Sequence, residues 1–149
     1  DCTVDTDLEI LIPDSYVESI SERLSLYTQL DNCEREEDLT LFREALIDRF
    51  GPIPMQVEDL FTALRVRWYG EEVGFEKIML KAKQLRMYFV SNHESPYFES
   101  DTFKRILEVL QFQLKNARLK HVGTNAMLVV DKVEGIHQVE SILNMMRGR

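Results

Sequence analysis

The stretch Glu44-Ala-Leu-Ile-Asp-Arg-Phe-Gly-Pro-Ile-Pro54 ends one helix and begins another. Gly51 followed by Pro52 is typical of a helix C-terminus, because glycine suits the left-handed cap position and proline cannot continue the helix. Pro54 is well placed to start the next helix, since proline fits the first helical turn. Together with Phe50, these residues are predicted to form the structural frame of a helix–turn–helix connection.

Two acids in this stretch lie at positions where the charges of the helix disfavour an anion. Asp48 falls in the last helical turn, where the helix dipole disfavours an anion by about 0.3–1 kcal/mol. Glu44 lies four residues earlier and adds like-charge repulsion of a few tenths of a kcal/mol. Residues that are unfavourable for the local structure and have no evident compensating interaction often belong to a functional surface.

The two acids belong to a longer helical pattern. Glu34, Glu37, Leu41, Glu44 and Asp48 follow one another at intervals of three and four residues, which places them on one helix face. Acids around one exposed apolar side chain resemble a docking patch with an anchor and a polar rim, whose complement is an Arg/Lys surface. The alternative is a solvated helix face with an incidental leucine. The predicted partner-docking residues are Asp48, Glu44, Leu41, Glu37, Glu34 and Arg49.

Hydrophobic periodicity predicts an α+β fold. The first part, 1–74, is expected to contain a frayed lead-in (1–7) and a short strand (8–12), followed by three helices. The helices are expected over about 15–30, over about 35–50, and from Pro54 toward Gly70. Ser15 and Glu18 are expected to form a capping box for the first of them. The second part, 75–149, is expected to contain strands at about 76–82 and 84–91, a helix at 101–115, strands at 117–122 and 125–132, and a helix at 134–147. We therefore expect an N-terminal helical subdomain with three helices after a short strand, followed by a four-stranded, mainly antiparallel sheet with two helices on one face. The whole chain, 1–149, is predicted to be a single regulatory domain of a larger protein.

Charge is distributed unevenly along the chain, whose net charge is −8. Residues 1–60 hold 16 acids and 4 bases, a net charge of −12, whereas residues 61–149 hold 10 acids and 14 bases, a net charge of +4. There is no apolar run of about 20 residues and no signal peptide, so no membrane association is expected. The chain begins with Asp1, which suggests a fragment of a longer protein, and its two cysteines, Cys2 and Cys33, indicate a reducing cytoplasm.

Motifs for catalysis, metals or cofactors are not found in the sequence. The glycines form no phosphate-binding pattern, and the three histidines are isolated from one another and from cysteine, so we expect no catalytic residues, no metal and no cofactor. Nucleic-acid binding by the basic second half is the alternative function, because Tyr88, Phe89 and Tyr97 lie among its Lys and Arg residues. An RRM signature is missing and the excess is only +4, so a solvated face is favoured and direct DNA binding is not expected.

Three motifs resemble a known family. Leu11-Ile12-Pro13 with Tyr16-Val17, then Arg23-Leu-Ser-Leu-Tyr27, then Leu46–Pro54 are similar to the C-terminal domain of the bacterial transcription-repair coupling factor (Mfd). The similarity extends over nearly the whole chain in order, although after Gly74 it rests mainly on the pattern of strands and helices. Arg23 and Tyr27 are interpreted as structural motif residues.

The resemblance implies a regulatory, non-catalytic domain of a bacterial cytoplasmic protein whose motor, an ATP-dependent DNA translocase, lies outside this chain. In the family, this domain docks on the UvrB-like module of the same protein and masks UvrA binding until stalled RNA polymerase is engaged. The expected partner is therefore that intramolecular module, with UvrA and RNA polymerase as indirect partners. Asp48 matches the family's Asp, whereas Ala45 occupies the position of the family's Glu. Glu44 is expected to substitute for that Glu from a slightly rotated position.

Overall fold

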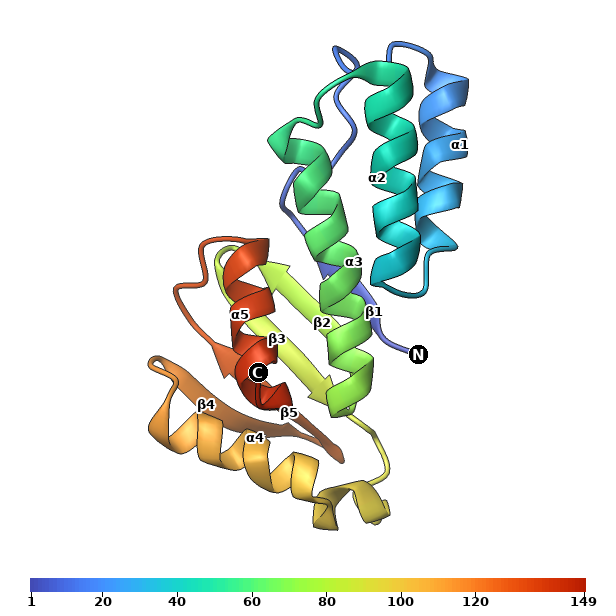
Figure 1. Ribbon diagram of the computed structural model, residues 1–149. Helices are drawn as coiled ribbons and strands as arrows, with labels where there is room; N and C mark the ends of the chain where they lie inside the picture. The colour runs from blue at the N-terminus through green and yellow to red at the C-terminus, as the bar shows by residue number, and fades with distance from the viewer. The chain divides into compact units, whose positions relative to one another are not determined.

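The computed structural model describes residues 1–149, which divide into two compact units. One unit consists of residues 9–64 and contains α1 (Ile20–Asp31), α2 (Glu36–Phe50) and the first half of α3 (Met55–Val73). The other consists of residues 1–8 and 65–149 and contains the sheet with its helices. Figure 1 shows the elements in chain order from blue to red. The α+β class is confirmed.

The predicted start of the first helix is wrong. Pro13 accepts backbone hydrogen bonds from the N–H groups of Tyr16 and Val17, at 3.0 and 3.1 Å, so this segment forms a turn rather than a helix. Helix α1 begins only at Ile20, where Ser19 accepts a hydrogen bond from the N–H of Glu22. The N-cap is therefore Ser19 and not Ser15, because the side chain of Ser19 accepts the hydrogen bond from the first turn of the helix.

Helices α2 and α3 pack through aromatic and aliphatic side chains in the 9–64 unit. Leu39, Phe42 and Leu46 form the buried side of α2. The ring of Phe42 meets the ring of Phe61 on α3 edge to face, with their centroids 6.0 Å apart. Pro54 precedes α3 and accepts hydrogen bonds from the first-turn N–H groups of Val57 and Glu58. The helices predicted for 35–50 and after Pro54 are confirmed to within one or two residues.

The other unit contains a five-stranded sheet, one strand more than expected. Its order is β1 (Thr3–Thr6), β2 (Phe75–Lys81), β3 (Gln84–Phe89), β5 (Asn125–Val130) and β4 (Ala117–Val122). The β1–β2 pair is parallel and the other three pairs are antiparallel.

The extra strand lies where a frayed lead-in was predicted, and the strand predicted at 8–12 is absent. Thr3 and Val4 pair with Lys77 and Ile78, so β1 completes its backbone hydrogen bonds on the edge of β2. This pairing joins residues more than 70 positions apart, and a local apolar run cannot reveal it.

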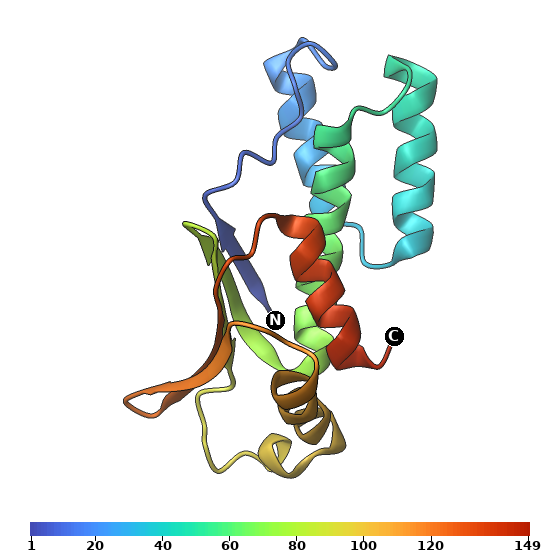
Figure 2. The ribbon, with the colours of Figure 1, turned by 90° about the vertical axis from the view of Figure 1, so that its left-hand side faces the viewer.

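Helices cover one face of this sheet. Figure 2 shows the sheet nearly edge-on, with α4 (Asp101–Phe112), α5 (Ile136–Arg147) and the end of α3 on the same side. The covered face contains Ile78, Leu85, Met87 and Leu128, all nearly inaccessible to solvent. The strand-strand-helix order predicted twice for 75–149 is confirmed, with a short 3₁₀ helix at Pro96–Glu99 between β3 and α4.

Candidate docking surface on helix α2

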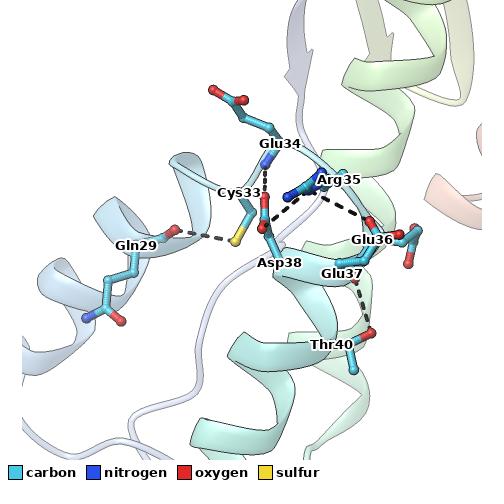
Figure 3. Close-up of polar contacts among 8 residues, drawn as sticks. All are labelled: Gln29, Cys33, Glu34, Arg35, Glu36, Glu37, Asp38 and Thr40. Atoms are coloured by element: carbon cyan, nitrogen blue, oxygen red, sulfur yellow. Dashed lines mark hydrogen bonds and ion pairs between the residues drawn. The ribbon is translucent and has the colours of Figure 1, made fainter.

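The N-terminal end of α2 is built from a compact set of polar contacts (Figure 3). Arg35 occupies the N-cap position with extended backbone angles. The backbone N–H of Glu34 donates to Oδ2 of Asp38 at 2.9 Å, and Nε of Arg35 lies 3.9 Å from carboxylate oxygens of both Glu37 and Asp38. Acids suit this end of a helix, because its dipole is positive there.

Glu34 does not lie on the predicted helical face. Helix α2 begins at Glu36, so Glu34 precedes it and its backbone follows the path into the cap rather than a helical turn. The periodicity of three and four residues therefore holds only from Glu37 onward. Glu34 is exposed beside the N-terminus of α2.

The remaining members of the predicted stripe share one exposed side of α2, which we call the acidic ridge: Glu37, Leu41, Glu44 and Asp48. At 3.6 residues per turn they fall within an arc of about 60°, nearly opposite the buried side chains of the helix. Leu41 is 66% exposed, so an apolar side chain stands in the middle of the acids. Ala45 is also exposed on the border of this ridge.

The basic residues within α2 are engaged elsewhere. Arg43 binds both carboxylate oxygens of Glu58 on α3, with Nη2 to Oε2 at 3.0 Å, and its guanidinium lies 4.9 Å from the ring centroid of Phe61. Arg49 reaches Glu22 on α1 at 3.0 Å and stacks over the ring of Phe50. Neither base therefore neutralises Glu44 or Asp48. Arg49 contributes to the packing of α2 against α1, in addition to its predicted place beside the patch.

The frame at the C-terminus of α2 depends on Tyr16. Its hydroxyl donates to the carbonyl of Gly51 at 2.8 Å and lies 3.3 Å from that of Leu46, while its ring lies 5.8 Å from the ring of Phe50. Burial raises the pKa of Tyr16 above its ordinary value, which favours the protonated hydroxyl that donates to Gly51. Tyr16 thus closes the helix end next to Asp48.

Gly51 differs in detail from the predicted cap. Its φ is positive, +89°, as expected for glycine, but ψ is −165°, which lies outside the left-handed helical region. The N–H of Gly51 still bonds to the carbonyl of Ile47 at 3.0 Å. The extended ψ turns the chain away from the helix into Pro52, and only glycine tolerates this combination of angles at little cost.

Arg23 and Tyr27 on α1 hold the segment that leads into the unit. Nη1 of Arg23 donates to the carbonyls of Val17 and Glu18, at 2.6 and 3.0 Å. The hydroxyl of Tyr27 accepts the N–H of Ile12 at 2.6 Å. Both side chains satisfy backbone groups of a segment that has no regular secondary structure, which gives these motif residues a structural role.

Three other features of the structure concern metal binding, cysteine reactivity and membrane-spanning helices. No group of three or more His, Cys, Asp or Glu side chains is arranged to hold a metal ion. Burial raises the pKa of Cys2 to about 11 and raises that of Cys33, so neither thiol is activated as a nucleophile. None of the helices combines the length and apolar character that crossing a membrane requires.

Comparison with known proteins agrees with this architecture. The family model of the TRCF domain matches residues 6–100, which include all of the 9–64 unit and the first two antiparallel strands. The chain belongs to the TRCF domain family. A solved structure, described as the crystal structure of the C-terminal domain of transcription-repair coupling factor, superimposes with a TM-score of 0.76 at 19% identity over 98% of this chain and 89% of that chain. This TRCF domain therefore has the fold of that C-terminal domain.

Curated relatives are transcription-repair-coupling factors. The Escherichia coli K12 protein is 26% identical over 145 residues, which is 97% of this chain and 12% of that protein. The Staphylococcus epidermidis RP62A protein is 30% identical over 87 residues, or 58% of this chain and 7% of that protein. The TRCF domain thus corresponds to a small part of the length of these relatives.

Sequence reasoning missed two contacts that position the ridge. The Arg43–Glu58 pair joins α2 to α3 across 15 residues, and no local spacing rule connects residues on different helices. The hydroxyl of Tyr16 caps a helix that ends some 35 positions later. Its position in the Ile12-Pro13 motif was the available signal, because a tyrosine after a proline turn has a polar end that needs a partner.

Proposed function

We propose that this TRCF domain is a non-catalytic regulatory module of a transcription-repair coupling factor. It docks through the acidic ridge on the UvrB-like module of its parent protein and masks UvrA binding until stalled RNA polymerase is engaged. The motor activity of the parent belongs to regions outside this chain. Membership of the TRCF domain family supports the general assignment, and the surface of α2 supports the mode of docking.

One observation carries the proposal: Glu44 and Asp48, the two ridge acids in the C-terminal half of α2, are exposed and have no basic partner on the helix. Arg43 and Arg49 are bound to Glu58 and Glu22, so Glu44 and Asp48 present their charge outward. Asp48 also lies at the unfavourable end of the helix dipole. A basic partner surface would relieve both the repulsion and the dipole penalty, so docking gains energy from a charge pattern that destabilises the free domain.

The dimensions of the ridge suit a compact contact. From Glu37 to Asp48 the helix rises about 16 Å. Leu41 lies near the centre, where an apolar anchor is most effective, and carboxylates surround it where water can still reach the rim. Charges at such a rim mainly determine orientation and association rate, and a reversed charge also weakens affinity.

The test is a titration of the TRCF domain against the separately prepared UvrB-like module at low and moderate salt. Asp48→Arg should weaken binding by roughly tenfold or more, because it replaces an attraction by a repulsion. Glu108→Arg on α4 is the matched control: it changes the net charge equally at an exposed site in the other unit and should bind normally. Equal affinities of the two variants at low salt, where such contacts are strongest, would refute docking through the ridge.

Ala45→Glu provides a gain-of-function test. The substitution places a carboxylate on the border of the ridge at the position where the family is expected to carry one. We expect tighter docking and slower dissociation, and competition by UvrA should weaken correspondingly. A decrease in affinity would show that the partner surface does not lie over this part of α2.

A further inference from the structure

Helices α4 and α5 lie on one side of the sheet (Figure 2). The other face, which we call the open face, carries side chains unlike those of the covered face. Strand residues alternate between the two faces, so the register of the strands identifies those on the open side. On β2 to β5 they include Lys77, Met79 and Lys81 on β2, Gln84, Arg86 and Tyr88 on β3, Met127 and Val129 on β5, and Arg118 and Lys120 on β4. On β1, Thr3 and Asp5 lie on the same side, in register with Lys77 and Met79. Five of these residues are basic and one is acidic, although the chain as a whole is acidic.

Strand pairing arranges these side chains in two rows across four strands. The first row is Lys77, Tyr88, Met127 and Lys120, and the second is Met79, Arg86, Val129 and Arg118. Neighbouring strands are about 4.8 Å apart and alternate residues about 7 Å apart, so the rows cover roughly 14 by 7 Å. An RRM-type sheet stacks two or three bases on a similar four-stranded surface.

The centre of the open face is apolar but protected. Met127 and Val129 are 4% and 1% exposed, although α4, α5 and the end of α3 lie on the other face of the sheet. Their neighbours in register are Tyr88, Arg86, Arg118 and Lys120, whose long side chains can cover the apolar floor while their polar ends reach water. Of the cationic groups on this face, Lys77 lies beside the ring of Tyr88, whereas Arg86 and Arg118 are bound to Gln84 and Asp131.

Only part of the positive charge is neutralised within the domain. Lys81 pairs with Asp5 at 3.0 Å, and Arg118 pairs with Asp131 at 2.7 Å. Arg86 instead donates to the side-chain oxygen of Gln84 at 2.8 Å.

Near Tyr88, Nζ of Lys77 lies 5.9 Å from the ring centroid. Glu76, at the bulge before Lys77, is an exposed acid at the border of the face. Lys77, Arg86 and Lys120 remain as cations available to an anionic ligand.

We propose that this open face binds single-stranded DNA. A base stacks on Tyr88, and Lys77, Arg86 and Lys120 contact phosphates on either side of it. A flat sheet with an aromatic ring among cations matches the two chemical features of a single strand, its unpaired bases and its phosphates. Duplex DNA does not offer a free base face to Tyr88. The choice of DNA over RNA rests on the proposed function in transcription-repair coupling, and the comparison with RNA tests it separately.

Binding is measured by the fluorescence anisotropy of a labelled oligothymidylate titrated with the 149-residue chain. Three phosphate contacts predict a slope of about −2 in log affinity against log salt, which is roughly a 20-fold loss of affinity between 50 and 200 mM salt. Unlabelled duplex of equal length should compete less well than the single strand. An oligouridylate that binds tenfold more tightly would overturn the assignment to DNA.

Substitutions separate stacking from charge. Tyr88→Ala should weaken binding by roughly 5- to 150-fold, the range for loss of one stacking contact, whereas Tyr88→Phe keeps the ring and should bind nearly as the parent chain does. Lys120→Gln should reduce the salt slope by about 0.7. Lys104→Gln on α4 removes the same charge from an exposed site on the helix-covered side and should change neither affinity nor slope.

Several results would overturn the proposal. These are the absence of binding at 50 mM salt, equal affinity of Tyr88→Ala and the parent chain, or equal effects of Lys104→Gln and Lys120→Gln. Binding of polyglutamate that matches that of the oligothymidylate, with no dependence on Tyr88, would instead identify the face as a site for an acidic protein. None of these outcomes bears on the acidic ridge, because docking to the UvrB-like module is measured separately with Asp48→Arg.

Discussion

The Arg43–Glu58 pair should contribute measurably to the stability of the 9–64 unit. The two side chains are 34% and 31% exposed and form two parallel hydrogen bonds between guanidinium and carboxylate. Exposed ion pairs contribute about 0.2–1 kcal/mol, and charge-assisted hydrogen bonds about 1.5–3 kcal/mol. Partial burial places this pair between the two ranges, so we expect a coupling free energy of about 1–2 kcal/mol.

A double-mutant cycle measures this coupling directly. The parent chain, Arg43→Met, Glu58→Gln and the double variant are unfolded in urea, and the non-additive part of the free energy of unfolding is the coupling. Arg43→Met should be more destabilising than Glu58→Gln by about 0.5–1 kcal/mol, because it also removes the contact of the guanidinium with the ring of Phe61.

The Arg49–Glu22 pair is the matched control. It joins α2 to α1 in the same unit, but through a single contact at 3.0 Å, and its side chains are 52% and 44% exposed. Its coupling should be below about 0.5 kcal/mol. If the Arg49–Glu22 coupling equals or exceeds that of Arg43–Glu58, then burial and bidentate geometry do not determine the strength of these ion pairs, and the reasoning above is refuted.

Two further predictions concern the sheet-containing unit. Gly74→Ala should lower the free energy of unfolding by about 3 kcal/mol or more, because φ is +99° and a Cβ would strike the ring of Tyr97. Gly123 also has a positive φ but open space around it, so Gly123→Ala should lower it by only about 1 kcal/mol. Similar urea midpoints for the two variants would contradict this. Burial raises the pKa of Cys2 from 9.0 to about 11, with a smaller contribution from the carboxylate of Glu71. The protonated thiol of Cys2 therefore contributes to stability below pH 9, and this contribution is lost as the pH rises from 9 to 11. The unfolding free energy of the parent chain should therefore fall by up to about 3 kcal/mol more than that of Cys2→Ala over this range, and parallel curves would contradict it.

Local patterns were sufficient to predict most of the fold. Helical periodicity located α2, α3, α4 and α5, and alternation located β2 through β5, each within a few residues. The failures at residues 3–12 come from contacts that are distant in sequence. Thr3–Thr6 becomes a strand because it pairs with the edge of β2. In the segment 8–12, which has no regular secondary structure, the N–H of Ile12 donates to the hydroxyl of Tyr27 on α1.

The exposed face of α2 was predicted correctly in the middle of the helix, but not at its N-terminal end. Spacing alone placed Leu41, Glu44 and Asp48 on one exposed face, because a helix interior obeys a fixed period. Glu34 was misplaced, since a helix boundary depends on capping contacts that periodicity does not contain. The partners of Arg43 and Tyr16 lie on other elements, and only the packed structure brings them together.

The net charge of a segment is a poor guide to function when secondary structure directs its charged side chains to different faces. Over residues 61–149 the excess of positive charge is only +4, which by itself does not favour an anionic ligand. A strand, however, sends alternate residues to opposite faces, and here five cations reach one face while the covered face is apolar. The same sorting acts on α2, where the bases turn toward neighbouring helices and the acids turn outward. Each unit therefore presents one surface on which a single sign of charge predominates, and charge should be summed over a face, not over a segment, before a partner is inferred.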